Sequence, residues 1–400
     1  MLDLTSGLPF HWIVNGLPYQ YPRLEADHRC EVLVVGGGIT GALVAHACMT
    51  AGLGTTVLDA RAIGTGSTAA STALLQYEID TPLYKLVDLV GKEDAVRAYT
   101  LGVETIAALV DLALSLGELS GVRRMSLQYA SKRSHEKDLR REHGLRKANG
   151  IQVDLVSRTD VKALFGSIDA MALMSGDAAQ VDPYALTHRL LQEVIRLGGS
   201  VYDRTGITTF KRTGEGGHEV MTRNGQRIVA DHLVMATGYE SQHYLSKPVM
   251  DLNSTYAIAS ERIAQETLWY DDCLIWETAQ PYLYMRTTPD RRVIMGGLDE
   301  PFRNPLRRDA LLSRKSKKLE SAFKKLMPTV PFVAEYSWCG TFGSTKDGLP
   351  YIDRDPKTGA WFVLGMGGNG ITFSKIGADI VRDAIRGRPN VDARIFRFDR

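Results

Sequence analysis

Short apolar runs and glycine-rich turns alternate near the start of the chain. Residues 31–35 read EVLVV, a β-branched run that predicts a strand buried on both faces of a parallel sheet. Residues 42–51 carry apolar side chains at helical spacing and predict a helix that ends at Gly52 and Gly54. Residues 55–58 predict a second strand. This order indicates a strand–helix–strand unit of an α/β protein.

Longer periodic segments follow this unit. Residues 87–149 and 155–165 predict helices, and Asp182-Pro183 begins another helix that runs to Leu197. Residues 307–326 predict an amphipathic helix, with four large apolar side chains on one face. The remaining segments predict strands at 201–213, 219–223, 228–240 and 361–364, a strand-rich region at 251–295, and a helix at 372–385.

The composition is ordinary for a globular protein. A chain of 400 residues predicts two or three domains, and 44% hydrophobic with 24% charged residues gives enough material for a buried core. The net charge of +2 is too balanced to indicate nucleic acid or a membrane surface as partner.

The four cysteines, Cys30, Cys48, Cys273 and Cys339, are far apart, with no CxxC pair and no Cys/His zinc spacing. We therefore expect neither a disulfide framework nor a metal site, and a reducing cytoplasm fits best. Residues 1–27 lack the pattern of a signal peptide. The most apolar stretch, residues 101–117, contains Glu104 and Asp111, so no membrane span is expected.

A glycine motif joins the first strand to its helix. Gly36, Gly38 and Gly41 form G-x-G-x-x-G directly after the strand, and Asp59 ends the next strand. In such a unit the first glycine permits a tight turn, the second lets the backbone approach a pyrophosphate, and the third allows close packing of helix and strand. The helix N–H groups at Ile39 and Thr40 attract phosphate. The motif predicts a dinucleotide site, with Asp59 binding a ribose hydroxyl and disfavouring NADP.

Two further segments favour FAD over NAD. Residues 61–72 read RAIGTGSTAAST, whose hydroxyl groups can follow an extended flavin, although a flexible surface loop has the same composition. Near the C-terminus, residues 365–370 read GMGGNG between a strand and a helix. Helix N–H groups there can stabilise an anionic reduced flavin ring. An NAD-only dehydrogenase has no need of this element, and would be colourless.

Several motifs together resemble one family. VLVVGGGITG, GSTAASTALLQ, VDPYALTHRL, DHLVMATGY, DGLPYID and GMGGNGITFS extend over residues 21–385. With them the chain resembles the FAD-dependent oxidoreductases of the D-amino-acid oxidase, glycine oxidase and sarcosine oxidase superfamily. The lead-in YPRLEADHRCEVLVVGGG is most similar to the γ-glutamylputrescine oxidoreductase branch.

The resemblance implies an α/β fold with two domains. One is a Rossmann-like FAD-binding domain of the glutathione-reductase type, discontinuous over 1–90, 166–245 and 340–400. The other is an inserted α+β substrate domain, 91–165 and 246–339, with a large mixed or antiparallel sheet. FAD, bound non-covalently, is the implied cofactor. Its implied contacts are Gly36, Gly38, Ile39, Thr40, Gly41, Asp59, Ala60, Arg61, Ser67, Thr68, Thr72, Ala73, Leu74, Ile207, Ala236, Thr237, Gly238, Gly365, Met366, Gly367, Gly368, Asn369, Gly370, Ile371 and Thr372.

The resemblance also implies the reaction. The substrate carbon lies over flavin N5, a neutral amine transfers hydride, and the resulting imine hydrolyses. The family's amino-acid oxidases bind the substrate carboxylate through arginines, but this chain has Phe342 and Gly368 at the two corresponding positions. This departure favours an amine, or an amino acid held in another way.

Four residues are candidates for the substrate side. Alternation along the strand predicts that Tyr282, Tyr284 and Arg286 share a face that lines the pocket. Tyr256 begins the strand-rich region and is expected to reach the substrate. Lys346 is expected near the flavin edge. Each has a plainer alternative: packing for the tyrosines, and a surface position for Arg286 and Lys346. Trp276 and Trp338 are expected in the core or the pocket wall.

Two positions bear on the flavin and its oxidant. Some sarcosine oxidase relatives attach the flavin through a cysteine at the position of Gly340, next to Cys339, so covalent attachment stays open. The oxygen-activating lysine of the family falls at Ile294, so either oxygen or another electron acceptor serves as oxidant.

Two other functions are compatible with the sequence. Residues 132–147 and 307–325 are rich in basic side chains, as in enzymes of the superfamily that modify a tRNA base, although solvated helix faces have the same composition. The chain could also be a flavoprotein subunit of a larger complex. Substrate identity, stereochemistry and oligomeric state have no determinant in the sequence.

Overall fold

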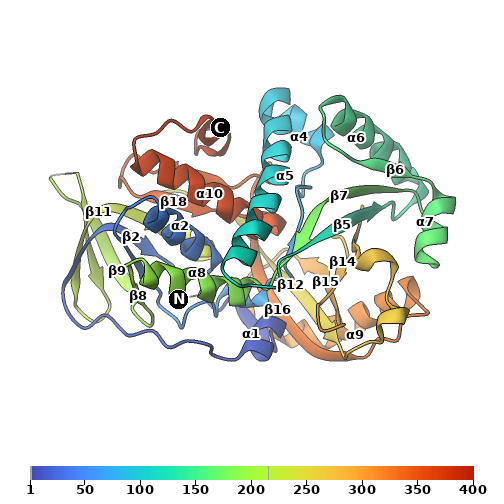
Figure 1. Ribbon diagram of the computed structural model, residues 1–400, viewed down its shortest axis with the longest axis horizontal. Coiled ribbons are helices and arrows are strands. Elements are labelled where there is room, and N and C mark those ends of the chain that lie inside the picture. The colour runs from blue at the N-terminus through green and yellow to red at the C-terminus, as the bar shows by residue number, and fades with distance from the viewer. Residues whose placement is uncertain (1, 215) are drawn as a thin grey trace.

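The computed structural model describes residues 2–214 and 216–400. Met1 and Glu215 lie outside the described residues, and they fall in the predicted FAD-binding segments 1–90 and 166–245. Two large sheets lie side by side, each with its own covering helices (Figure 1). An α/β fold with one parallel nucleotide-type sheet and one large mixed sheet was predicted, and this fold class is confirmed.

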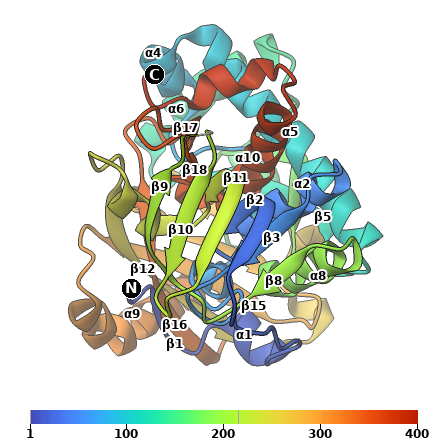
Figure 2. The same cartoon turned by 90° about the vertical axis from the view of Figure 1, so that its left-hand side faces the viewer.

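The eight-stranded sheet is built from three distant parts of the chain. Its central strands, in the order β18-β11-β2-β3-β8, run parallel, and antiparallel β17 lies at one edge (Figure 2). β9 and β10 form an antiparallel extension from β11. The strands are β2 His28–Val35, β3 Thr55–Leu58, β8 Ser200–Tyr202, β9 Ile207–Arg212, β10 His218–Thr222, β11 Arg227–Met235, β17 Tyr351–Arg354 and β18 Trp361–Leu364.

Three helices cover one face of this sheet. They are α2 Ile39–Thr50, α8 Pro183–Arg196 and α10 Gly370–Ile385, and α2 packs against both of the others. Their apolar side chains bury Val32, Val34 and Val57 of the parallel strands. Asp182 begins α8 by accepting hydrogen bonds from the Tyr184 and Ala185 amides. The helix predicted over 183–197 therefore forms as expected.

The ten-stranded sheet has the order β1-β16-β12-β15-β14-β13-β5-β7-β4, with β6 paired to β7. All pairs are antiparallel except β5 with β13. The strands are β1 Thr5–Gly7, β4 Leu74–Leu75, β5 Val122–Tyr129, β6 Asp154–Val156, β7 Ala172–Gln180, β12 Asp251–Ser260, β13 Leu274–Glu277, β14 Tyr284–Thr287, β15 Val293–Glu300 and β16 Ala334–Ser344. Strands from the segments predicted for both domains thus pair in this one sheet.

The remaining helices surround the ten-stranded sheet and link it to the other. α9 packs on β12, β15 and β16, while α5 passes between the two halves of the molecule (Figure 1). These helices are α1 Phe10–Asn15, α3 Ser67–Ala70, α4 Leu83–Val90, α5 Lys92–Ser115, α6 Glu136–Ala148, α7 Arg158–Phe165 and α9 Pro305–Leu326. Short 3-10 helices are η1 Arg133–His135, η2 Gly238–Tyr244, η3 Gln265–Thr267, η4 Tyr270–Asp272, η5 Gly367–Asn369 and η6 Val391–Phe396.

Strand β5 corrects the expectation of continuous helices over 87–149. Its buried half, Ser126–Tyr129, pairs with β7 on one side and β13 on the other. These partners come from distant parts of the chain, so tertiary pairing overrides the local pattern. Residues 154–156 likewise form β6, which shortens the helix expected from residue 155.

Helix α5 is the one helix among the described residues that is long and apolar enough to cross a membrane. The sequence analysis expected no membrane span over residues 101–117, but α5, which contains most of them, is long and apolar enough to form one. Its apolar face packs on α4, α10 and β7, and 44% of its most apolar window is buried inside the protein. A core helix has this pattern, so the feature is weak evidence for a membrane span.

Candidate functional site

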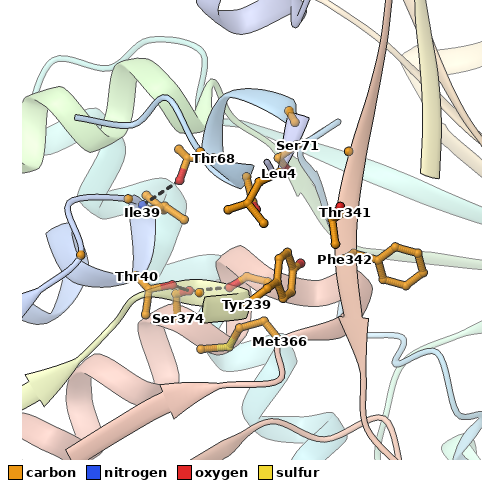
Figure 3. Close-up of a pocket in the computed structure, with 18 of the residues that line it drawn as sticks. Leu4, Ile39, Thr40, Thr68, Ser71, Tyr239, Thr341, Phe342, Met366 and Ser374 are labelled. Carbon is orange, nitrogen blue, oxygen red and sulfur yellow. Dashed lines mark hydrogen bonds between the residues drawn. The ribbon is translucent and has the colours of Figure 1, made fainter. Parts of the chain in front are cut away.

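A cavity of about 550 Å³ lies between the two sheets. The loops after β2, β3 and β18 line it from the eight-stranded sheet, and β14, β15 and β16 line it from the ten-stranded sheet. Figure 3 shows four segments converging on it: α2, residues 61–72 (called the 60s loop, which contains α3), β16, and the C-terminal loop at residues 365–370. Residues far apart in the sequence therefore meet in a single site.

The glycine motif forms a turn that only glycine fits. Gly36 has a φ of 116°, and a Cβ there would lie 2.2 Å from the Ala236 carbonyl oxygen. A Cβ on Gly41 would lie 1.7 Å from the Gly36 carbonyl oxygen. The first position thus requires a left-handed turn, and the second requires close packing of α2 on β2.

Asp59 holds the motif to the following loop. One carboxylate oxygen accepts a hydrogen bond from the Gly37 amide at 2.7 Å, and the other accepts from the Arg61 amide at 2.7 Å. Burial raises the pKa of Asp59 to about 6, although both amide hydrogen bonds oppose this. The carboxylate lines the cavity beside Ala60 and Arg61.

The N-terminus of α2 faces the same cavity. The Thr68 hydroxyl accepts a hydrogen bond from the Ile39 amide at 3.0 Å, and the Thr40 hydroxyl is 2.7 Å from that of Ser374 on α10 (Figure 3). The 60s loop and α10 are thereby held to the start of α2. Helix N–H groups in such a place attract anions such as phosphate.

The C-terminal glycine loop is held against residues 76–80. The Asn369 side-chain amide donates to the carbonyl oxygens of Gln76 and Glu78, at 2.7 and 2.9 Å. The Gly368 amide donates to Asp80 at 3.1 Å. This places a carboxylate directly beside the loop that precedes α10.

Nearly all of the predicted cofactor residues line this cavity. Gly36, Gly38, Ile39, Thr40, Asp59, Ala60, Arg61, Ser67, Thr68, Thr72, Ala73, Leu74, Ile207, Ala236, Thr237, Gly238, Gly365, Met366, Gly367, Gly368, Asn369, Gly370 and Ile371 do so. Gly41 lies behind the lining, against Gly36, and Thr372 is buried within α10. The cavity therefore joins the two glycine loops that the sequence singled out.

Three aromatic rings form a row on the opposite wall. Tyr282 lies between Trp276 and Tyr284, with ring centroids 5.9 and 5.7 Å away. The Tyr282 hydroxyl donates to Asp80 at 2.7 Å, and the Trp276 indole N–H donates to Ser126 at 3.2 Å. All three rings line the cavity. Trp276 therefore lies in the pocket wall, which is one of the two positions expected for it.

The two ends of the cavity differ in chemistry. We call the part around Gly36, Gly38, Asp59 and Arg61 the glycine end. The part around Asp80, Asp299, Trp276, Tyr282 and Tyr284 is the acidic end. Burial, together with nearby Asp80, raises the pKa of Asp299 to about 6, although Thr255 and Lys315 oppose the shift. Asp80 and Asp299 escaped the sequence analysis because each lies in a segment with no recognised motif.

Arg286, Tyr256 and Lys346 do not line the cavity. Arg286 is buried: its guanidinium donates to the Thr72 carbonyl oxygen at 2.5 Å and lies 3.2 Å from His11. It supports the cavity wall from behind. Arg286 follows Tyr284 by two residues on β14, but its guanidinium is bound to the Thr72 carbonyl oxygen, and Thr72 lines the cavity in its place.

Tyr256 and Lys346 lie elsewhere. Tyr256 is buried under α9, with the Lys315 ammonium 5.1 Å from its ring centroid. Lys346 is exposed after the end of β16. For Tyr256 the structure thus fits the packing alternative, and for Lys346 the surface alternative.

Cys339 faces away from the cavity. Its thiol lies 3.4 Å from a carboxylate oxygen of Asp309 on α9, whereas the neighbouring Gly340 and Thr341 line the cavity. Burial raises the pKa of this thiol to about 12, so it stays protonated. Its position and protonation state both oppose bond formation with a group in the cavity.

The residues present fit FAD. The cavity extends from a glycine turn that a Cβ would fill, past a buried carboxylate, to a second glycine loop that begins a helix. The glycine end suits a dinucleotide and the second loop suits a ring system. No further group is needed to explain why these loops converge.

A family model described as FAD dependent oxidoreductase, DAO, matches residues 31–384. The chain belongs to this family. This match confirms the resemblance to the D-amino-acid oxidase superfamily, the assignment as an oxidoreductase and the use of FAD. The match does not test the roles expected of Arg286 and the other substrate-side candidates.

Individual relatives of this DAO family protein agree. The glycine oxidase of Bacillus licheniformis is 23% identical over 377 residues, which cover 90% of this chain and 94% of that one. The γ-glutamylputrescine oxidoreductase of Escherichia coli K12 is 24% identical over 413 residues, covering 92% and 86%. The crystal structure of glycine oxidase from Geobacillus kaustophilus superposes with a TM-score of 0.76 at 19% identity, covering 91% and 96%. These values do not separate the two branches.

Proposed function

We propose that the protein oxidises the C–N bond of a small amine or amino acid, with FAD as the bound cofactor. The continuity of the cavity carries this proposal, because one space joins the dinucleotide turn to the aromatic and acidic wall. When bound, the flavin supplies a hydride acceptor at N5, so the substrate leaves as an imine that water hydrolyses.

The chain's own residues have three tasks in this proposal. The Gly36–Gly41 turn and the start of α2 hold the pyrophosphate, and Asp59 holds the ribose. The 365–370 loop and α10 hold the ring system, and their N–H groups stabilise negative charge on it. Trp276, Tyr282 and Tyr284 exclude water from the substrate and orient it.

An ordinary α-amino acid is disfavoured as substrate. The arginine that the resemblance implies at residue 368 is replaced by Gly368, where even a Cβ would lie 3.0 Å from Asp80 and from the Tyr282 hydroxyl. At the other position, the Phe342 ring points away from Leu4 and Tyr239 (Figure 3). An amine, or an amino acid bound without these arginines, fits the wall better.

The proposal also includes non-covalent attachment of FAD, a division into two domains and a location in the cell. Cys339 faces α9, which supports a flavin held without a covalent bond. Segments 1–90, 166–245 and 340–400 are proposed as the FAD-binding domain, and 91–165 with 246–339 as the substrate domain. The four cysteines are free, which supports a cytoplasmic location. Oxygen or another acceptor takes the electrons.

A tRNA base as substrate has less support. In the basic segment 132–147, Arg146 is buried against Glu142 at 2.8 Å. In the segment 307–325, Arg308 pairs with Asp3 and Asp309, and Lys315 pairs with Glu300. Because these three cations are paired inside the protein, they do not contribute to a phosphate-binding surface, whereas the other lysine and arginine side chains of the two segments are exposed.

The absorbance spectrum of the purified protein tests the proposal. We expect the visible bands of an oxidised flavin, and their loss on anaerobic addition of one member of a panel of amines, D- and L-amino acids and N-methyl amino acids. Colourless protein that FAD does not reconstitute contradicts the proposal. Reduction by a nucleoside alone favours the tRNA alternative.

A further inference from the structure

Among the described residues, the cationic side chains that line the cavity lie at its glycine end. At the glycine end Arg61 pairs with Glu240 at 2.9 Å, and Arg223 lies against Gly206 and faces Ala60. At the acidic end the lining contains Asp80, Asp299 and Glu78, with no Lys, Arg or His among the residues that the structure describes there. A ligand entering the acidic end therefore meets net negative charge.

The carboxylates at the acidic end keep unused hydrogen-bonding capacity. Glu78 is 6% exposed, yet its Oε2 has no hydrogen-bond partner among the described residues. The buried Oδ1 of Asp299 also lacks one within the same residues. A buried carboxylate oxygen without a donor is costly, so both atoms point to a donor that a ligand supplies.

The nearby cations do not satisfy these carboxylates. Lys315 donates to the Leu298 carbonyl oxygen at 2.7 Å and to Glu300 at 2.6 Å. Arg146 lies 3.7 Å from Glu78 but is shared with Glu142 at 2.8 Å. Both cations thus have closer partners, and the cavity side of the acidic end keeps its negative charge.

The aromatic row suits the same kind of ligand. Trp276, Tyr282 and Tyr284 present neighbouring rings in the cavity wall. An ammonium group held near such faces is stabilised by cation–π attraction. A carboxylate gains nothing from these rings and is repelled by the acids.

The acidic end also adjoins a second space. A second cavity of about 580 Å³ shares Asp80 and Trp276 with the first. These two residues form a common wall, so a ligand group at Asp80 lies between the two spaces. Asp80 also accepts a hydrogen bond from the Gly368 amide of the 365–370 loop, where the reacting carbon belongs. An ammonium held at Asp80 therefore lies a short alkyl chain away from that carbon, as the second charge of a small diamine does.

We propose that the substrate is an alkyl diamine or polyamine, whose distal, non-reacting ammonium is bound by Asp80 and Asp299 against the row of Trp276, Tyr282 and Tyr284. The proposal rests on the proposed function and names its substrate class. The distal ammonium donates hydrogen bonds to the carboxylates, while the proximal amine reacts in its neutral form.

Calorimetric titration of the oxidised holoenzyme under anaerobic conditions at pH 8 tests this assignment. The probes share one carbon chain: 1,4-diaminobutane, butylamine and 4-aminobutanoate. We expect 1,4-diaminobutane to bind at least about tenfold more tightly than butylamine, a difference of about 1.4 kcal/mol. 4-Aminobutanoate should bind more weakly than either. Tighter binding of 4-aminobutanoate than of the diamine would overturn the proposal.

Three variants locate the effect. Asp80→Asn and Asp299→Asn should each weaken diamine binding about tenfold and leave butylamine within about twofold, since only the diamine has a second charge. Asp154→Asn, an exposed aspartate on β6 outside both cavities, is the matched control and should change neither ligand. Equal weakening of both ligands, or no change in either acidic-end variant, contradicts the assignment.

Failure of this assignment differs from failure of the proposed function. If an amino acid with a free carboxylate reduces the flavin and the diamine neither binds nor reduces it, the function stands and the diamine proposal falls. If the diamine binds with the expected charge dependence but no compound reduces the flavin, the binding proposal stands and the function falls.

Discussion

The two ends of the cavity use different parts of the polypeptide. At the glycine end the backbone makes the site: a left-handed turn, a helix N-terminus, and a carboxylate that accepts from two amides. At the acidic end side chains make it, from β14, β15 and the segment after β4. Backbone features need a local sequence motif, whereas side-chain features need only the right residue at the right place in three dimensions. The glycine end therefore has features common to dinucleotide-binding proteins, whereas the acidic end is particular to the ligand of this protein.

Gly41→Ala should have the largest effect. The new Cβ would overlap the Gly36 carbonyl oxygen, so α2 must move from β2. We expect loss of bound flavin and a cost of about 1–3 kcal/mol or more in the free energy of unfolding. Flavin content and thermal unfolding measure this. Gly54→Ala is the control, because its Cβ would meet only the Glu31 side chain at 3.7 Å. Equal effects at both positions would contradict the backbone argument.

Asp59→Ala should weaken FAD binding without unfolding the protein. The substitution leaves the Gly37 and Arg61 amides without their acceptor and removes the proposed ribose contact. A loss of about 1–3 kcal/mol corresponds to a dissociation constant roughly fivefold to 150-fold higher. Flavin fluorescence during titration of the apoprotein measures it. Asp59→Asn, which keeps one carbonyl acceptor, should lie between. Full flavin occupancy in Asp59→Ala counts against its role.

Tyr282→Phe should change the acidic end alone. It removes the hydroxyl that donates to Asp80 but keeps the ring between Trp276 and Tyr284. We expect unchanged flavin content and a KM about tenfold higher, since a hydrogen bond to a charged group contributes about 1.5 kcal/mol or more. Tyr270→Phe, an exposed tyrosine outside both cavities, serves as control. Loss of flavin in Tyr282→Phe would mean that the two ends are not separable.

Binding of an alkyl diamine should weaken as the pH falls through about 6. The raised pKa of Asp299 means that its carboxyl is ionised above that pH and protonated below it. Ammonium groups stay charged throughout this range. The groups facing Asp299 are Asp80, Tyr282, Tyr284 and Lys315. Calorimetry at pH 5 and pH 8 should show the loss, and Asp299→Asn should flatten it. If diamine binding to Asp299→Asn still weakens as much between pH 8 and pH 5, another group is responsible for the pH dependence.

Cys339→Ser should have the smallest effect. The thiol faces α9 and not the cavity, so the flavin should stay bound in the variant and come free of the wild-type protein on acid precipitation. The absorbance of the supernatant is the measurement. Flavin that stays with the precipitated wild-type chain, and is lost in Cys339→Ser, would show a covalent bond.

How far the sequence predicts each end follows from the same difference. The 36–41 turn, Asp59 and the 365–370 loop have local patterns, and the predicted strands 55–58 and 361–364 match β3 and β18. Asp80, Asp299 and Trp276 have no local pattern, because their meeting depends on the pairing of β5, β13, β14 and β15. Strand β5 itself was missed for this reason. Arg286 shows the converse, since a cation on a suitable strand turned inward to the Thr72 carbonyl oxygen.

The discontinuous order of the eight-stranded sheet has a consequence during synthesis. β2 and β3 leave the ribosome early, but β18, which pairs with β11 beside β2, follows some 300 residues later in the chain. Until residues 361–385 emerge, Ala236 and the glycine turn have no C-terminal loop opposite them. Contacts of such long range form slowly and leave apolar surface exposed in the meantime. The cofactor therefore meets its complete site only when synthesis has passed α10, which makes FAD binding a late event in maturation and lengthens the period in which the growing chain benefits from chaperones.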